Sequence, residues 1–179
     1  MNKKTMETKK IKKVSKVFRY LRAVSERIEI FTDGSAKGNP GPGGYGVVLR
    51  FKGKEKELSQ GFRMTTNNRM ELLAIIVALE SLKTNKYPVK VFSDSKYVID
   101  SITKGWVFGW VKKDFKGKKN VDLWQRYLKL HSKFKLQFEW VKGHAGHPEN
   151  ERCDYLAVKA AEGSNLLIDS VFESENPGL

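Results

Sequence analysis

The stretch IEIFTDGSAKGNPGPGGYGVVLR, residues 28–50, decides how the chain folds. Its first part alternates apolar and polar side chains, as a half-buried strand does, and ends on Asp33. Six Gly and two Pro then fall within residues 34–46. Three interpretations are open: a hairpin turn, a glycine loop that binds phosphate, or a carboxylate held at a strand end for chemistry.

The glycines match the spacing G-x-G-x-x-G but lack the context of a nucleotide site. A dinucleotide motif needs a helix directly after the glycines, whereas the strand-like run VVLRF follows here. No Gly-Lys-Ser/Thr completes a phosphate loop of the Walker type. The sequence therefore predicts a long link over residues 34–46 between two adjacent strands, and links of this length tend to carry function.

Outward from this stretch, the chain alternates between strand and helix patterns. Two strands meet at a turn near Gly53, and a helix follows with Thr66 or an adjacent Asn as its N-cap. The apolar stripe of that helix comprises Leu72, Ile75, Ile76, Leu79 and Leu82. Further patterns predict strand 89–94, helices 95–104 and 120–134, strand 135–142 and helix 148–163. This order predicts an α/β domain with a mixed five-stranded sheet flanked by helices.

The 179 residues suggest one domain with appended ends. Residues 1–27 hold ten Lys/Arg and two Glu, which is typical of either a basic amphipathic helix or a disordered arm. The domain is expected over residues 28–163, followed by an acidic flexible tail over residues 164–179. The net charge of +14 favours a polyanionic partner, most often nucleic acid, over an anionic membrane surface.

The single cysteine, Cys153, excludes an intramolecular disulfide and favours a reducing, cytoplasmic location. No apolar run reaches the roughly 18 residues of a membrane span, and the N-terminus lacks the apolar core of a secretory signal. We therefore expect no membrane association.

Four carboxylates occupy positions from which they could meet. Asp33 and Asp94 end predicted strands, Glu71 falls in the first turn of the Asn-rich helix, and Asp154 lies in the last helix. Each alone has a structural explanation, as a turn residue, a partner of the helix dipole or a surface charge. Together, in a basic chain, they predict a site for divalent cations and phosphate chemistry at one sheet edge.

The segment WVKGHAGHPENERCD places His144 in a loop flanked by glycines, a setting that suits proton transfer near neutral pH. A zinc site is the rival interpretation, but one Cys and three His in the whole chain argue against it. His147, directly before Pro148, is interpreted as structural.

Five segments carry a resemblance to a known family. In order and spacing, TDGSAKGNPGPGGYG, TTNNRMEL, SDSKYV, NVDLWQR and WVKGHAGHPENERCD resemble the signature segments of bacterial ribonuclease HI, over residues 28–161. The resemblance implies the ribonuclease H-like fold, with three antiparallel strands and then two parallel ones. It further implies a monomer that hydrolyses the RNA strand of RNA–DNA hybrids with two Mg²⁺ or Mn²⁺ ions, leaving 5′-phosphate and 3′-hydroxyl ends.

The same resemblance implies a role for each catalytic residue. Asp33 would bridge both ions, Glu71 and Asp94 would complete the shell of one ion, and Asp154 would complete the other. Glu71 would also lie near the 2′-hydroxyl at the scissile position. His144 would assist proton transfer or product release.

Substrate contacts are implied in three places. Asn39, Asn67 and Asn68 would read 2′-hydroxyls of the RNA strand, and Thr66 and Asn120 would hold a DNA-strand phosphate. The basic stretch 104–120 resembles the protrusion that grips DNA in this family, although some of its aromatic residues could equally belong to the core. Lys96 stands where many relatives carry Gln. The contacts expected from the stretch and its surroundings are Lys96, Trp106, Trp110, Lys112 and Lys113.

Two other functions remain open at this level. One is a DNA nuclease or resolvase of the same superfold, and the other is a noncatalytic module that binds RNA or hybrids. The 2′-hydroxyl readers and the intact carboxylate set favour the hybrid-directed endoribonuclease over both.

Overall fold

The computed structural model describes residues 26–178. The predicted basic extension, residues 1–27, therefore lies almost entirely outside the described residues. Within the described part, none of the helices combines the length and the apolar character needed to cross a membrane.

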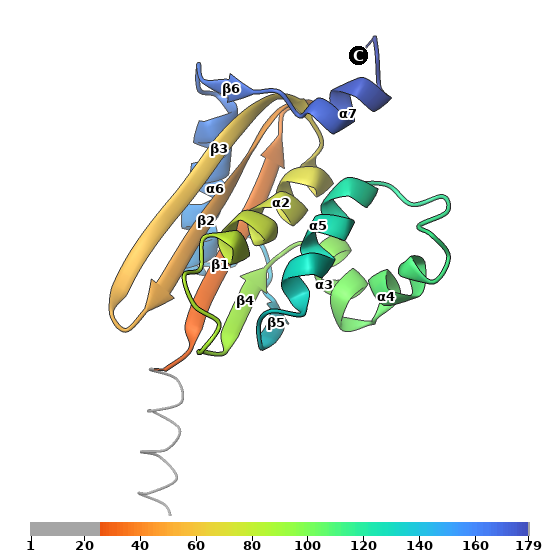
Figure 1. Ribbon diagram of the computed structural model, residues 1–179. Coiled ribbons are helices and arrows are strands. Elements are labelled where there is room, and N and C mark those ends of the chain that lie inside the picture. Colours follow the sequence, from red (N-terminus) through yellow and green to blue (C-terminus); the bar gives the residue numbers. More distant parts are fainter. Residues whose placement is uncertain (1–25, 179) are drawn as a thin grey trace, which may run out of the picture.

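A six-stranded mixed sheet forms the centre of the fold, in the order β5-β4-β1-β2-β3-β6 (Figure 1). Neighbouring strands are antiparallel from β1 to β3, whereas β4 is parallel to β1 and β5 is parallel to β4. The predicted arrangement of three antiparallel and two parallel strands is thus confirmed, and β6 adds a sixth strand at the edge. The strands are β1 (Ile28–Ala36), β2 (Gly41–Phe51), β3 (Lys54–Thr65), β4 (Val89–Ser93), β5 (Leu136–Trp140) and β6 (Leu166–Leu167).

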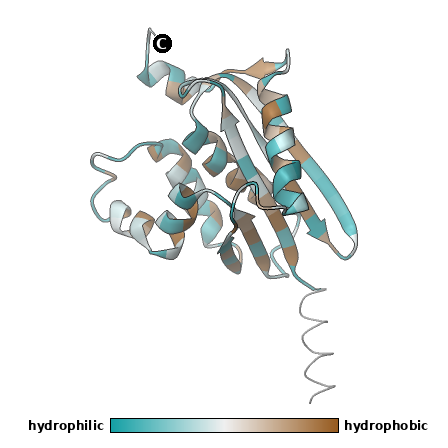
Figure 2. Ribbon diagram, turned by 180° about the vertical axis from the view of Figure 1, so that it is seen from behind, coloured by the Kyte–Doolittle hydropathy of each residue, from teal (hydrophilic) through white to brown (hydrophobic). Residues whose placement is uncertain are grey.

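Helices cover both faces of the sheet. Helix α2 packs on one face against β1 and β2, with α5 outside it, and α6 lies across β1, β2 and β3 on the other face. The view from behind in Figure 2 shows α6 in this position. The short helix α4 was not predicted, because its residues read as a basic stretch with aromatic side chains. The helices are α2 (Asn67–Glu80), α3 (Lys96–Thr103), α4 (Trp106–Val111), α5 (Val121–His131), α6 (Pro148–Ala161) and α7 (Ser170–Glu175).

The main core lies between the sheet and α2. Ile30 and Val47 point from the sheet into this layer and are fully buried. The predicted apolar stripe of α2 is buried over Leu72, Ile75, Ile76 and Leu79, and Met70 and Ala74 are buried as well. Burial extends around most of α2 because the sheet contacts one side and α5 the other. The helix therefore has little freedom to shift, and residues near its N-terminus are held firmly.

The glycine-rich link is much shorter than predicted. Strand β1 continues to Ala36 and β2 begins at Gly41, so only four residues, 37–40, connect them. Gly44 and Gly46 belong to the ladder, opposite Ser35 and Asp33. The prediction of a long link was wrong because glycines in a strand were taken for loop residues. Their physical role is to let another backbone approach closely.

The C-terminal segment also departs from the prediction. Residues 164–178 form β6, which pairs with β3, and then α7, so the prediction of a flexible tail is wrong for this part of the chain. Asp169 is buried and accepts hydrogen bonds from Arg69 and Thr65. Arg69 is itself only 2% exposed, and a buried guanidinium requires carboxylate partners. The polar composition of the tail concealed this partnership between residues 100 positions apart.

Candidate active site

Two parallel strands bring Asp33 and Asp94 close together in the sheet. Thr32 of β1 pairs with Ser93 of β4, and each aspartate is the next residue along its chain. Because these strands are parallel and in register, the residues that follow this pair lie side by side. The prediction that each aspartate ends a strand is right for Asp94, which follows β4, and wrong for Asp33, because β1 continues to Ala36.

Glu71 joins them because α2 touches β1 at a glycine. A Cβ atom on Gly34 would lie 2.2 Å from the backbone nitrogen of Glu71, which shows how closely the two backbones approach. Glu71 is the fifth residue of α2 and lies in the second turn, not in the first turn as predicted. Its carboxylate accepts hydrogen bonds from the Ser95 hydroxyl and from the Asn67 amide, the latter at 2.8 Å.

Asp154 approaches these residues from the opposite face of the sheet. A Cβ atom on Gly46 would lie 2.0 Å from the carbonyl oxygen of Cys153, so α6 rests directly on β2 at this point. Gly46 pairs with Asp33 in the ladder. The glycine therefore places the residue after Cys153, Asp154, near Asp33, and the two carboxylates interact electrostatically.

Burial and neighbouring carboxylates raise the pKa of Asp33 and of Glu71. Burial is the main cause that raises the pKa of Asp33 to about 8, followed by the negative charge of Asp94, with smaller contributions from Asp154 and Glu71. The Gly34 amide, which donates a 2.7 Å hydrogen bond to Asp33, opposes this rise. Burial and then the charge of Asp94 raise the pKa of Glu71 to about 7, against the hydrogen bonds from Ser95 and Asn67. The site concentrates negative charge where water is scarce.

The donor set fits a hard divalent cation in its chemistry. Carboxylate oxygens are the preferred ligands of Mg²⁺, and the buried Asn150 Oδ1 beside this cluster has no hydrogen-bond partner. The Asn150 amide nitrogen lies 3.3 Å from Asp94 Oδ2. Within residues 26–178, however, no three Asp, Glu, His or Cys side chains converge closely enough to form a metal shell as they stand. Asp33, Glu71 and Asp94 each accept a hydrogen bond from a local donor instead.

His144 lies in the loop that passes the carboxylate cluster. Its backbone has φ 51°, in the left-handed region, and its side chain is exposed. The preceding Gly143 abuts Asp94, because a Cβ atom there would lie 2.5 Å from Asp94 Oδ2. No hydrogen bond joins the His144 ring to a carboxylate in the described chain. The loop therefore passes beside the carboxylate cluster, and the His144 imidazole is exposed to solvent.

The Asn-rich start of α2 is tied to the glycine-rich link. Asn39 Oδ1 accepts a 3.1 Å hydrogen bond from the Asn67 backbone nitrogen. Thr66 occupies the N-cap position of α2, but no side-chain cap hydrogen bond forms there, contrary to the expectation of a capping role. The Thr66 hydroxyl and the exposed Asn68 are therefore left available to an external partner.

Beside these residues lies a hollow of about 670 Å³. It brings together Thr66, Asn68 and Asn39 with Asn120, whose side-chain nitrogen donates a 3.1 Å hydrogen bond to the Tyr97 hydroxyl. Several lining residues were not predicted, and the basic run 116–119 was the available signal for two of them. The residues missed include Tyr97, Arg69, Lys118, Lys119, Phe172, Glu175 and Asn176.

The basic stretch 104–120 folds around α4 as a protrusion from the helical layer (Figure 1). Val107 and Phe115 are its buried anchors, so some aromatic residues of the stretch do belong to the core. Trp110 is half-buried, with its ring edge-on to Trp124 at a centroid distance of 5.6 Å. Trp106 is 46% exposed. The predicted contact residues Lys112 and Lys113 are also exposed.

A family model, RNase H, matches residues 25–162. The chain belongs to the ribonuclease H family. Among curated relatives, "Ribonuclease H" of Desulforamulus reducens is 56% identical over 149 residues, covering 80% of this chain and 93% of that protein. "Ribonuclease H" of Rippkaea orientalis is 51% identical over 155 residues, covering 84% of this chain and 94% of that protein.

Solved structures of ribonucleases H share the fold. LC9-RNase H1, described as a type 1 RNase H with the type 2 active-site motif, has a TM-score of 0.70 and 32% identity, covering 84% of this chain and 81% of that one. LC11-RNase H1, solved in complex with an RNA/DNA hybrid, has a TM-score of 0.59 and 29% identity, covering 76% of this chain and 97% of that one.

Lys96 gives this ribonuclease H a cation next to the carboxylate cluster. Its ammonium lies 5.0 Å from the centre of the Trp140 ring. The Trp140 indole nitrogen in turn donates a 2.9 Å hydrogen bond to the backbone oxygen of Asp94. The exposed lysine is therefore held near the site through the tryptophan, where it can meet a polyanion.

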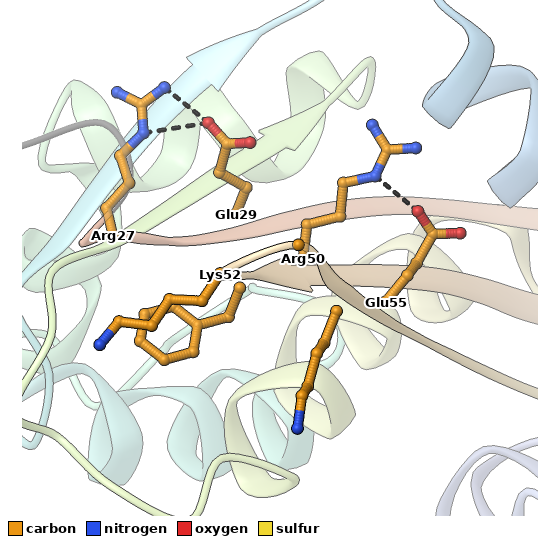
Figure 3. A pocket seen from close by; sticks show the side chains of 8 residues that line it. Arg27, Glu29, Arg50, Lys52 and Glu55 are labelled. Atoms are coloured by element: carbon orange, nitrogen blue, oxygen red, sulfur yellow. Dashed lines mark hydrogen bonds and ion pairs between the residues drawn. The ribbon is translucent and has the colours of Figure 1, made fainter. Parts of the chain in front are cut away.

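A second hollow lies at the far end of β1, near the β2–β3 turn (Figure 3). Arg27 donates to Glu29 and Arg50 donates to Glu55, so its charges are largely paired within the hollow. Lys52 lies over the rings of Phe51 and Tyr87. Because this hollow lies at the opposite end of β1 from Asp33, we do not assign it to the active site.

Proposed function

We propose that this chain is an endoribonuclease that hydrolyses the RNA strand of RNA–DNA hybrids and leaves 5′-phosphate and 3′-hydroxyl ends. Membership of the ribonuclease H family supports the activity. The observation that carries the proposal is that burial and the nearby charges of Asp94, Asp154 and Glu71 raise the pKa of Asp33 to about 8. A cluster of this kind is stabilised by a bound cation.

The four carboxylates would hold two Mg²⁺ ions, with Mn²⁺ as an alternative, when substrate is bound. Such ions supply activation of the attacking water and stabilisation of the leaving oxygen. Asp33, at the centre of the cluster, would contribute to both ions. Because its pKa is about 8, it must lose a proton to serve as a ligand at neutral pH. Ser95 and Asn67 hold the Glu71 carboxylate in position beside it.

Recognition of the hybrid would divide between two surfaces. On the RNA side, Asn67 donates a hydrogen bond to Glu71, and its backbone nitrogen donates to Asn39. Asn39, Asn67 and Asn68 would meet 2′-hydroxyls, the groups that distinguish RNA from DNA, with Asn39 and Asn68 at the boundary between the two surfaces, since they also line the hollow. On the DNA side, Thr66 and Asn120 line the hollow and would hold a backbone phosphate. The lysines of the hollow and protrusion supply the charge that attracts phosphates. The further DNA-side contacts proposed are Lys96, Trp106, Trp110, Lys112 and Lys113.

His144 would act in proton transfer or product release. Support comes from its place in the loop that passes Asp94 and from the exposure of its ring. An imidazole exchanges protons readily near neutral pH. Movement of the loop would be needed to bring the ring to the reacting phosphate.

The test is a cleavage assay on an end-labelled RNA–DNA hybrid, with Mg²⁺ and with EDTA, beside duplex RNA and duplex DNA. The native chain should cut only the hybrid and only with the metal. Asp94→Asn should abolish cleavage while largely preserving hybrid binding. Cleavage of duplex DNA at a comparable rate would point to a DNA nuclease. Full activity of Asp94→Asn would contradict the metal-dependent mechanism.

A further inference from the structure

The C-terminal helix α7 forms one wall of the hollow that we assign to the DNA strand. Phe172, Glu175 and Asn176 line it together with residues of α2 and of the loop before α5. These three residues lie beyond residue 162, where the match to the family model ends. The wall is therefore contributed by a part of the chain that the family pattern does not describe.

Helix α7 is held at the hollow by a buried ion pair. Arg69 donates to both carboxylate oxygens of Asp169, each at 2.7 Å, and Asp169 is the residue directly before α7. The same guanidinium donates to both oxygens of Asp122 at the start of α5, and it lies 5.8 Å from the centre of the Phe172 ring. The wall is thus fixed to α2 and α5, which provide other lining residues.

The wall places a negative charge among positive ones. Lys118 and Lys119 line the hollow together with Glu175. Glu175 is exposed and forms no ion pair with any residue in the part of the chain that the structure describes. The adjacent Asn176 is tied to its own helix, because its side-chain nitrogen donates a 2.8 Å hydrogen bond to the Phe172 carbonyl. Glu175 therefore faces the hollow as an unneutralised carboxylate.

We propose that Glu175 determines how tightly the hollow binds DNA-strand phosphates, by repelling them. The inference rests on the proposed hybrid-cleaving function. A phosphate drawn in by Lys118 and Lys119 also meets the Glu175 carboxylate that lines the same hollow, and like charges close together reduce affinity. The consequence is faster release of the cut hybrid than the lysines alone would allow.

Two variants of the full chain test this, each removing one negative charge from α7. Glu175→Gln removes the charge that lines the hollow. Glu173→Gln removes a charge that instead pairs with Arg63, outside the hollow, and so controls for net charge. Binding of a fluorescein-labelled RNA–DNA hybrid is measured by anisotropy in EDTA, at about 50 mM and about 200 mM KCl. Melting temperatures establish that both variants fold.

Glu175→Gln should bind the hybrid about 2- to 5-fold more tightly at the lower salt, with a smaller gain at the higher salt, because screening weakens the repulsion. Glu175→Lys should give a larger gain. In multiple-turnover cleavage, Glu175→Gln should lower KM by more than it changes kcat. Glu173→Gln should bind as the native chain does.

Equal gains in Glu175→Gln and Glu173→Gln would overturn the inference, because net charge would then explain them. Unchanged binding of both Glu175 variants would also overturn it. Neither of these binding results argues against the proposed function, provided that the native chain cleaves the hybrid. If the native chain cleaves no hybrid with Mg²⁺, the proposed function fails, and that outcome is separate from the comparison of variants.

Discussion

The backbone nitrogen of Glu71 lies so close to Gly34 that a Cβ atom on residue 34 would come within 2.2 Å of it. A second contact of this kind joins Gly46 to the carbonyl oxygen of Cys153 at 2.0 Å. The two glycines lie on β1 and β2 and admit helices from opposite faces of the sheet. Gly34 and Gly46, which carry no side chain, therefore set how close Glu71 and Asp154 come to Asp33.

Gly34→Ala and Gly46→Ala should each damage the site without altering a functional group. The added methyl would overlap backbone atoms, which cannot move as a flexible side chain can, so α2 or α6 must shift. Forced packing of this kind costs about 1–3 kcal/mol or more. We expect a lower free energy of unfolding in urea and a loss of at least about tenfold in kcat/KM for hybrid cleavage, because a small displacement of catalytic groups has a large effect on rate.

Gly109→Ala is the matched control. Gly109 lies in α4, where an added Cβ atom meets nothing within 4 Å and the backbone φ is not positive. In a helix this substitution stabilises by roughly 0.5–1 kcal/mol. Native activity of Gly34→Ala, together with an unchanged free energy of unfolding, would show that the helix spacing is not set by the glycine.

Asp33→Asn should make the cation-free protein more stable at high pH. The folded-state pKa of Asp33 is about 8, against an ordinary value of 3.8, so the folded chain binds more protons than the unfolded chain between these pH values. Stability of the native chain must therefore fall as pH rises through this window. The neutral asparagine avoids that loss.

The measurement is urea unfolding in EDTA at about pH 5 and about pH 8. The stability advantage of Asp33→Asn over the native chain should grow by roughly 3–4 kcal/mol between the two conditions. An advantage that is independent of pH would show that Asp33 is already ionised in the folded chain at pH 5.

Asp169→Ala should destabilise the domain although it lies outside the active site. Arg69, 2% exposed, would lose two of its hydrogen bonds and one of its two carboxylates. Breaking a buried ion pair costs about 3–5 kcal/mol, because the remaining charge stays buried. Asp122 still neutralises Arg69, so a loss of about 3 kcal/mol is expected in urea unfolding. A change no larger than that of Glu173→Gln, which breaks an exposed pair, would contradict the structural role of the C-terminal segment.

Removing residues 1–25 should weaken hybrid binding and flatten its salt dependence. These residues hold nine Lys/Arg and one Glu. Contacts between basic residues and phosphates release counterions, so fewer such contacts reduce the slope of log Kd against log salt concentration. The single-turnover cleavage rate at saturating enzyme should stay unchanged, because the carboxylates are intact. Identical binding of both chains at low salt would exclude an electrostatic role for these residues.

Local patterns predicted most of the fold. Alternation gave the strands on either side of Asp33, and helical spacing gave Leu72, Ile75, Ile76 and Leu79 as buried residues of α2. The predictions failed where one local sequence pattern was compatible with two different structures. Glycines that pack against α6 read as loop residues, and the lysine- and tryptophan-rich stretch around α4 did not read as a helix.

The candidate site was predicted in its residues but not in its geometry. Asp94 follows a buried strand and Asp33 lies within one, and the parallel pairing of Thr32 with Ser93 aligns them. The hydrogen bonds of Glu71 with Ser95 and Asn67 could not be predicted. They depend on how α2 and α3 meet, and this contact is set by core packing.

The sequence by itself determined the order of the main strands and helices, the family, the basic charge and which carboxylates are candidates for the site, because these are properties of short segments and composition. Tertiary structure alone decided three further features. It made the glycines spacers between backbones, gave Arg69 a partner in Asp169, and placed Glu175 on the wall of the hollow. Each of these features joins segments far apart in the chain. Their free energy comes from burial and charge pairing across packed elements, which no local pattern records.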